Sequence, residues 1–326
     1  MMNRKELTAM LRRTEVVPFM LLVAVFLISM AFSSNFRDLA YLLRTSNRYI
    51  ELSLTALAMT FIITAGMIDL SVPAVMSCSA TIAAILFHAG LPMGWGIVCG
   101  LLVGAACGAV NGLLVAYARL PAMIVTIGTM NAFRGISQIF IGDKSLGRFP
   151  DWFNRVDSLT VFRLFGAQVS VTVVFFLLCG IAAYLVLHRT SVGRKIFAIG
   201  ANEQAAIHSG VNTRRIKLNL FIVSGILSAI AGLLTMSRLL LVQYSMALNA
   251  EIDIVIMVLL GGADINGGRG SIIGTFIAIF LVIILKTSLI VANITADTQM
   301  FVMGIILLVS IIIPNIGSML QEMKDK

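Results

Sequence analysis

The sequence is dominated by apolar runs, and ten of them are long enough to cross about 30 Å of hydrocarbon. They lie at about 16–34, 49–66, 72–88, 93–117, 122–141, 168–187, 216–236, 250–262, 271–290 and 298–313. Hydrophobic residues make up 59% of the chain and the mean hydropathy is +0.99, which excludes a soluble globular fold. We therefore predict an all-α polytopic membrane protein with about ten transmembrane helices, in a single domain that covers residues 1–326.

The distribution of cations predicts how these helices are oriented. If the N-terminus is inside, the inside segments hold 14 Lys and Arg and the outside segments hold 8. Cytoplasmic loops of membrane proteins collect cations, so the excess places both termini in the cytoplasm. We expect three cytoplasmic segments: an N-terminal tail at 1–15, a long loop at 188–217 and a C-terminal tail at 315–326. The net charge of +9 then follows from topology, and nothing in the sequence suggests a nucleic-acid surface.

The longest polar passage runs from residue 189 to 217 and has six cations against one acid, Glu203. Its centre can form two helical turns, with Asn202 as the N-cap, Glu203 in the first turn and Gly210 as the stop. The candidate coupling residues are therefore Asn202, Glu203, Gln204, Ala205, Ala206, Ile207, His208, Ser209 and Gly210. Two interpretations stay open from the pattern alone, a docking surface on the cytoplasmic face and an ordinary solvated loop.

The fourth apolar run carries a glycine at every fourth position. The five residues are Gly96, Gly100, Gly104, Gly108 and Gly112. In a helix this spacing makes one bare face, and small residues let helix backbones approach closely in lipid. We predict a helix-packing face, which could meet either another helix of the subunit or a second subunit.

Two short motifs are alike, Gly66-Met-Ile-Asp69-Leu-Ser71 and Gly261-Gly-Ala-Asp264-Ile-Asn266. Each lies between two apolar runs, and Ser71 followed by Val-Pro suggests an N-cap with proline in the first turn. Broken helices at membrane depth expose backbone groups to a substrate in transporters. The competing interpretation is two tight cytoplasmic turns with capping aspartates.

A few polar residues lie inside the runs, where they are costly and tend to face a cavity or another helix. They are Asn111, Thr126, Thr129, Asn131, Arg134, Gln138, Glu251 and Asp253. Uncharged hydroxyls and amides suit hydrogen bonds to a polyhydroxylated solute. Arg134 lies near the outer end of its run and could instead extend its charge to the interface. The candidate translocation residues are Asp69, Ser71, Asn111, Thr126, Thr129, Asn131, Asp264 and Asn266.

The sequence lacks the motifs of several enzyme classes. It has no G-x-x-x-x-G-K-[ST] phosphate loop, no G-x-S-x-G and no H-E-x-x-H, so we do not expect catalysis by this chain. Its four cysteines fall in apolar runs without a CxxC pair and its three histidines are scattered, so we expect no metal site.

Several stretches together resemble the permeases of ribose-type ABC sugar importers. They are Gly66-Met-Ile-Asp69-Leu-Ser71-Val, Asn111-Gly-Leu-Leu-Val, Leu120-Pro-Ala-Met-Ile-Val-Thr126-Ile-Gly-Thr129, Phe133-Arg-Gly135, Gly193 to Ala206 with Ser209-Gly210, and Leu259 to Ser271. The resemblance covers about residues 50–290, and the run of Thr126-Ile-Gly-Thr129 and Phe133-Arg-Gly135 is most similar to the rhamnose and autoinducer 2 members. Pro73 departs from the glycine of many relatives, and Asp264-Ile-Asn266 departs from a more common serine-containing version.

The resemblance implies a permease of the type II importer kind in a bacterial inner membrane. It implies a second permease copy, identical or not, two ATPase subunits that use ATP and Mg²⁺, and an external sugar-binding protein. It also implies that Asn202 to Gly210 docks on the ATPase. We therefore expect an importer of a monosaccharide or small polyol, similar to rhamnose, ribose or autoinducer 2. The alternative is a self-contained secondary transporter or facilitator, whose ion coupling would need Glu251 and Asp253; a scaffold without substrate is disfavoured by the polar residues within the runs.

Overall fold

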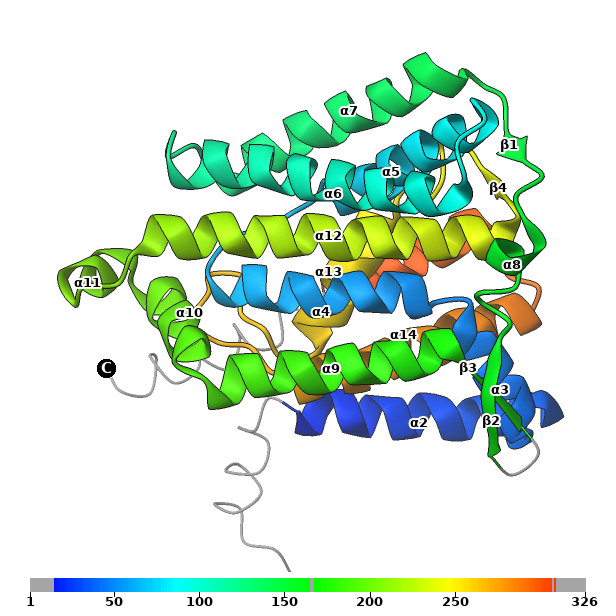
Figure 1. The fold of residues 1–326 in the computed structure, drawn as a ribbon. Helices are drawn as coiled ribbons and strands as arrows, with labels where there is room; N and C mark the ends of the chain where they lie inside the picture. Colours follow the sequence, from blue (N-terminus) through cyan, green and yellow to red (C-terminus); the bar gives the residue numbers. More distant parts are fainter. Residues whose placement is uncertain (1–14, 165–166, 307, 309–326) are drawn as a thin grey trace, which may run out of the picture.

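The computed structural model describes residues 15–164, 167–306 and 308, most of which are helical. The long helices run side by side and give the molecule two ends (Figure 1). They are α2 (Val16–Phe32), α4 (Ile50–Thr64), α5 (Val72–His88), α6 (Met93–Ala116), α7 (Ala122–Ile141), α9 (Val171–Arg189), α12 (Thr213–Leu239), α13 (Ala250–Leu260), α14 (Ile272–Val291) and an apolar helix at Ala296–Ile306.

Each predicted run contains one of these helices, although the tenth run, 298–313, is described only in part. By length and composition, α6, α9, α12 and α14 suffice to cross a membrane, and α2, α4, α5 and Ala296–Ile306 are shorter apolar helices. The polytopic helical fold is thus confirmed, while ten crossings and cytoplasmic termini stay predictions. Residues 1–14 of the first predicted tail, and all of the tail 315–326, lie outside the described residues.

The expectation of an all-α fold is wrong at one end of the molecule. Two small antiparallel sheets form there, β1 (Leu146–Gly147) with β4 (Leu241–Val242) and β2 (Thr160–Leu164) with β3 (Ala167–Ser170). The short helices η1 (Ser34–Arg37), α3 (Leu39–Asn47) and α8 (Asp151–Asn154) lie at the same end (Figure 1). These connections lie beyond the long helices, where backbone groups need not be satisfied within a single helix. Pairing into short strands is therefore available to them.

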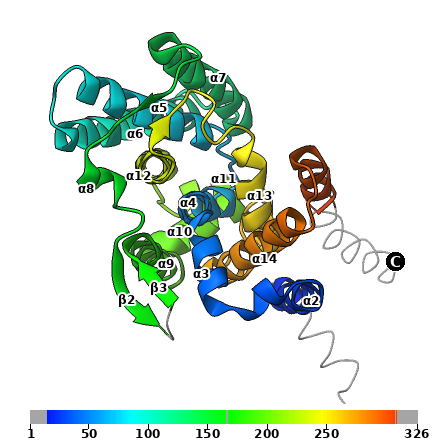
Figure 2. The ribbon, with the colours of Figure 1, turned by 90° about the vertical axis from the view of Figure 1, so that its right-hand side faces the viewer.

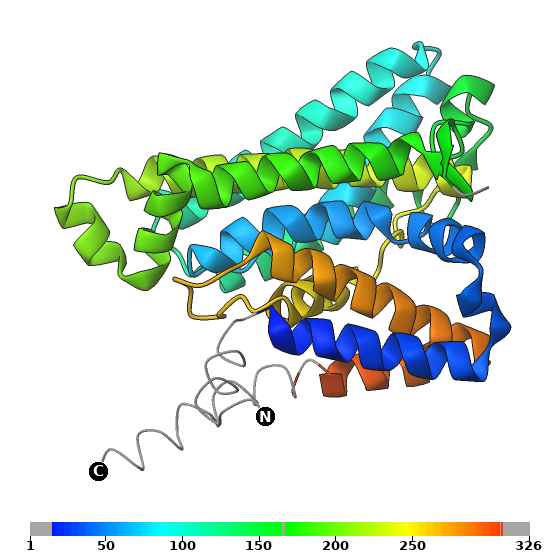
Figure 3. The same ribbon diagram turned by 90° about the horizontal axis from the view of Figure 1, so that it is seen from below.

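Helix α12 lies in the middle of the bundle and packs on α4, α5 and α6 (Figure 2). Helix α14 lies along α2 (Figure 3), where the Ser29 and Ser288 hydroxyls are 2.6 Å apart. Nearly every residue of α4 is buried. By contrast, α2, α7 and α9 expose large apolar side chains, including Phe19, Ile124 and Ile139. Exposed apolar area on this scale is rare in soluble proteins and fits a surface that faces lipid.

The predicted glycine face of α6 is buried and packs within the subunit. Its members are Gly96, Gly100, Gly104, Gly108 and Gly112. The first two lie against α5 and the last three against α12. A methyl group at Gly96 would lie 2.7 Å from the carbonyl oxygen of Ala83, and one at Gly104 would lie 2.5 Å from that of Gly225. The close contacts of α6 with α5 and α12 therefore depend on the absence of a Cβ atom.

Candidate functional site

The central polar passage forms two short helices at the end of the molecule opposite the sheets (Figure 1). They are α10 (Ser191–Ala201) and α11 (Glu203–His208). The predicted capping of α11 is confirmed, because the Asn202 side chain accepts a hydrogen bond from the Ala205 amide at 3.0 Å. Gly210 has a φ of 80°, which suits the glycine stop. Glu203 also binds Lys217 at the start of α12, with 2.6 Å between Oε2 and Nζ.

The sequence interpretation missed helix α10, which lies in the first basic flank. Its signals were present: Thr190 is the N-cap and accepts from the Gly193 amide, and Val192, Ile196 and Ile199 recur at helical spacing. Ile196 and Ile199 are buried against the bundle, so α10 is anchored by its apolar face while its cations stay exposed.

Helix α11 projects beyond the bundle and presents a mixed surface (Figure 1). Ala206 is buried, whereas Gln204, Ile207 and His208 are exposed. Exposed cations flank this surface on both sides in sequence, at Arg194, Lys195, Arg214 and Arg215. A single exposed apolar side chain with a basic rim resembles the centre and rim of a protein interface.

The two similar motifs form tight turns that lie against each other. The Asp69 carboxylate accepts from the Ser71 amide at 3.1 Å, and the Asp264 carboxylate accepts from the Asn266 amide at 3.0 Å. A Cβ atom built on Gly66 would be 3.4 Å from the carbonyl oxygen of Asn266. The geometry fits the interpretation of two tight turns, in which each aspartate accepts from the amide two residues on, but neither aspartate caps a helix, since the N-cap positions of α5 and α14 are Ser71 and Ser271.

Asp69 is the centre of a buried polar cluster at the start of α5. Its Oδ1 accepts from the Ser71 hydroxyl at 2.6 Å, and its Oδ2 accepts from the Ser224 hydroxyl of α12 at 3.0 Å. Asn111 of α6 donates to the Ser71 hydroxyl at 2.8 Å. All four side chains are buried, and Asn111 Oδ1 has no partner among the described residues. The cluster therefore ties the turn after α4 to α5, α6 and α12.

The expected N-cap role of Ser71 is wrong in detail. The residue occupies the N-cap position of α5, but its backbone is helical, with φ −78° and ψ −12°, and its side chain makes no capping hydrogen bond. A capping side chain requires an extended backbone to reach the first turn. The Ser71 hydroxyl instead serves Asp69, and Pro73 stands in the first turn of α5 as predicted.

The other candidate translocation residues lie in three places. Thr126 of α7 is buried and donates to the Ile68 carbonyl at 3.2 Å, so it joins the turn that carries Asp69. Thr129 and Asn131 lie apart from that cluster, with their side chains bonded to carbonyls of their own helix. Asp264 and Asn266 belong to the neighbouring turn. The eight residues thus do not form one site, and their role in translocation stays a prediction.

Arg134 is held by backbone carbonyls of the same chain, and extension of its charge to the membrane interface stays a prediction. Its side chain is half-buried and its Nη1 donates to the Tyr244 carbonyl at 2.7 Å and to the Met246 carbonyl at 3.3 Å. These carbonyls belong to the irregular segment between β4 and α13, where Ala247 and Asn249 both have positive φ. Arg134 therefore donates hydrogen bonds to backbone carbonyls that lie outside any helix or strand.

Two ion pairs within the bundle were also missed. Glu51 of α4 is only 1% exposed and binds Arg238 of α12, with 2.6 Å between Oε1 and Nε. Asp253 of α13 binds Lys286 of α14. Glu51 and Lys286 are each the lone charge of a predicted run, 49–66 and 271–290, and that signal could have predicted a partner of opposite sign.

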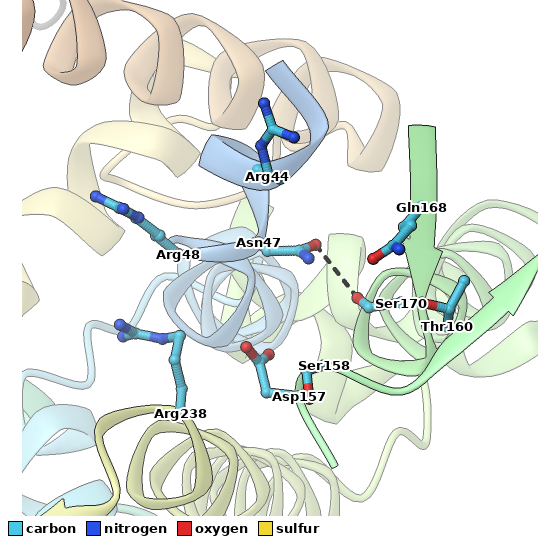
Figure 4. Close-up of a pocket in the computed structure, with 9 residues that line it drawn as sticks. All are labelled: Arg44, Asn47, Arg48, Asp157, Ser158, Thr160, Gln168, Ser170 and Arg238. Carbon is cyan, nitrogen blue, oxygen red and sulfur yellow. Dashed lines mark hydrogen bonds between the residues drawn. The ribbon is translucent and has the colours of Figure 1, made fainter. Parts of the chain in front are cut away.

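The opposite end of the molecule has an open polar pocket of about 460 Å³ (Figure 4). Its lining comes from α3, β2, β3, α12 and the segments beside them: Arg44, Asn47, Arg48, Asp157, Ser158, Thr160, Gln168, Ser170 and Arg238. Ser170 donates to Asn47 Oδ1 at 3.3 Å. Burial raises the pKa of Asp157, while its hydrogen bond from Thr172 and the nearby Arg238 act in the opposite direction. In the part of the chain that the structure describes, no three His, Cys, Asp or Glu side chains gather as metal ligands.

Comparison with known proteins identifies the family. Residues 41–311 match the family described as branched-chain amino acid transport system / permease component. The chain belongs to this permease family. It is 31% identical over 301 residues to the autoinducer 2 import system permease protein LsrD of Escherichia coli strain K12, with 90% of each chain covered. The same protein of Shigella flexneri is also 31% identical, and that of Escherichia coli O157:H7 is 30% identical, over the same shares.

These matches confirm the resemblance to ribose-type ABC importer permeases. The chain is a permease component and is embedded in a membrane. The family match runs from within α3, through α11, to beyond the end of α14.

Proposed function

We propose that this chain is the transmembrane subunit of an ATP-driven importer for a monosaccharide or a related small polyol. Substrates similar to rhamnose, ribose or autoinducer 2 are the first to test, because the relatives named above import autoinducer 2 and cover the chain almost end to end. The chain acts in a bacterial plasma membrane with its termini in the cytoplasm. It works with a second permease copy, an ATPase and an external binding protein.

The observation that carries this proposal is helix α11. It is short, capped at Asn202, held to α12 by the Glu203–Lys217 ion pair, and exposed at Ile207. The side-chain cap orders α11, and the ion pair ties it to α12. A displacement of α11 therefore moves α12 with it. We infer that a soluble ATPase, which uses ATP and Mg²⁺, binds this helix.

ATP supplies the energy because it binds the two states of the ATPase with different affinity. Closure of the ATPase then moves α11, and the bundle alternates between outward and inward openings. The solute meets the hydroxyls and amides of the candidate translocation residues, and the buried Asn111 Oδ1 has no hydrogen-bond partner among the residues that the structure describes. No covalent chemistry is required of this chain.

A secondary transporter is the second candidate, and the ion pair of α13 disfavours it. Coupling to an ion would use Glu251 and Asp253, the close carboxylate pair within the apolar runs. Asp253 already has a cation partner in Lys286. Purified chain in liposomes, without ATPase or binding protein, separates the two candidates: solute uptake by the chain alone would support the secondary transporter and refute the importer.

The coupling role is tested in liposomes that hold the permease, its ATPase and the binding protein. Gly210→Ala forces a left-handed backbone on a residue with a Cβ atom, at a cost of about 1–2 kcal/mol, and disturbs the end of α11. We expect lower ATP-dependent uptake with unchanged affinity of the binding protein for its sugar. The control is Gly90→Ala, which has the same backbone strain and the same open surroundings at the other end of the bundle. Equal uptake by the two variants would refute the docking role of α11.

A further inference from the structure

Three separate stretches of backbone meet at the C-terminal end of α10. They are the end of α4 at Thr64 and Gly66, the end of α10 at Gly200, and the turn between α13 and α14 at Gly267 and Gly268. We call these five residues the glycine junction. One hydrogen bond joins two of the stretches, from the Gly268 amide to the Thr64 carbonyl at 2.9 Å.

The contacts in the glycine junction are between backbone atoms. A Cβ atom on Gly200 would overlap both the Thr64 carbonyl oxygen and the Gly268 nitrogen. One on Gly267 would lie 2.7 Å from the Gly66 Cα atom and 2.9 Å from the Gly200 Cα atom. Even the smallest side chain at Gly200 would therefore push α10 away from the Thr64–Gly268 hydrogen bond. Substitution at Gly267 or Gly268 would be strained as well, because φ is 89° and 75° there.

A contact without side chains is stiff, since no rotamer can adjust when one partner moves. The glycine junction also lies between the two parts of the candidate site. On one side, α10 leads through Asn202 alone to α11. On the other, Gly66 is three residues from Asp69, whose cluster holds α5, α6 and α12 together.

We propose that Gly200, Gly267 and Gly268 are positioning residues for ATP-coupled transport. The glycine junction moves as one body, and it transmits displacement of α11 to the turn that carries Asp69. It therefore repositions α5, α6 and α12 together. This inference rests on the proposed function, because it presumes that α11 is driven by an ATPase.

The first test uses Gly200→Ala in the reconstituted transporter, with Gly94→Ala as the matched control. Both glycines are helical, but a Cβ atom on Gly94 meets nothing within 4 Å. We expect Gly200→Ala to copurify with the ATPase and to hydrolyse ATP at a rate within about twofold of wild type, while uptake falls at least tenfold, on the order of 1.4 kcal/mol of lost coupling. Uptake within twofold of wild type, with normal assembly, would overturn the proposal.

A second test needs no substitution and holds if Gly200→Ala fails to assemble. Hydrogen–deuterium exchange is followed at the 262–270 turn of the wild-type transporter, with ATP and without it. We expect the Gly268 amide to stay protected in both conditions, because the glycine junction remains closed throughout the cycle. Rapid exchange in either condition would contradict transmission through this contact. The proposed function fails separately, if wild-type liposomes show no ATP-dependent uptake at all.

Discussion

Replacing Gly104 by alanine tests the packing of α6 on α12. The new methyl group would lie 2.5 Å from the Ala229 Cβ atom and 2.5 Å from the Gly225 carbonyl oxygen. Non-bonded carbon atoms prefer about 3.5–4.0 Å, so the helices must separate locally by about 1 Å. Overpacking of this kind costs about 1–3 kcal/mol. For a chain of this size that corresponds to a fall in apparent Tm of about 1.5–4.5 °C.

The measurement is thermal unfolding of the purified chain in lipid nanodiscs, at one fixed scan rate because unfolding is irreversible in many membrane proteins. Gly128→Ala is the control, since a methyl group there meets nothing within 4 Å. We expect its Tm to be unchanged or slightly higher, because alanine favours helix. The fall in Tm of the double variant Gly104→Ala/Ala229→Gly should be smaller than the sum of the falls in the two single variants, because the overlap with the Ala229 Cβ atom is removed. If the Tm of Gly104→Ala equals that of wild type, the assignment of the contact between α6 and α12 is refuted.

Three further predictions concern polar groups. Arg238→Met leaves Glu51 buried without its cation and should cost about 3–5 kcal/mol of stability, most of which Glu51→Gln restores in the same thermal assay. Asn202→Ala removes the cap on the Ala205 amide, costs α11 about 1 kcal/mol, and should weaken copurification with the ATPase, whereas Asn202→Asp should retain it. Burial raises the pKa of Asp157, so the stability it contributes is complete below about pH 4 and is lost as pH rises through the folded pKa. The melting temperature of Asp157→Asn relative to wild type should therefore increase from pH 4 to pH 7; a constant difference would contradict this.

The spacing of residues in the chain was enough to predict elements that depend on local physics. The length of the apolar runs predicted the long helices. Asn202 predicted the start of α11, because an N-cap acts on the first turn of its own helix, and Gly210 predicted its end. The glycine face of α6 was predicted as a packing surface from its period alone. Helix α10 was predictable in the same way from Ile196 and Ile199, but the surrounding cations obscured the pattern.

Whatever depends on contacts distant in sequence was decided only by the tertiary structure. The sequence did not indicate whether the face of α6 meets its own subunit, and the fold answers this by setting Gly104 against Gly225. Asp69 and Ser224 are 155 residues apart, and no periodicity links them. The glycine junction is the strongest case, since three glycine-bearing stretches that lie far apart in the sequence meet through backbone contacts. Local propensities act over a few residues, whereas close packing selects partners by shape after the helices have assembled.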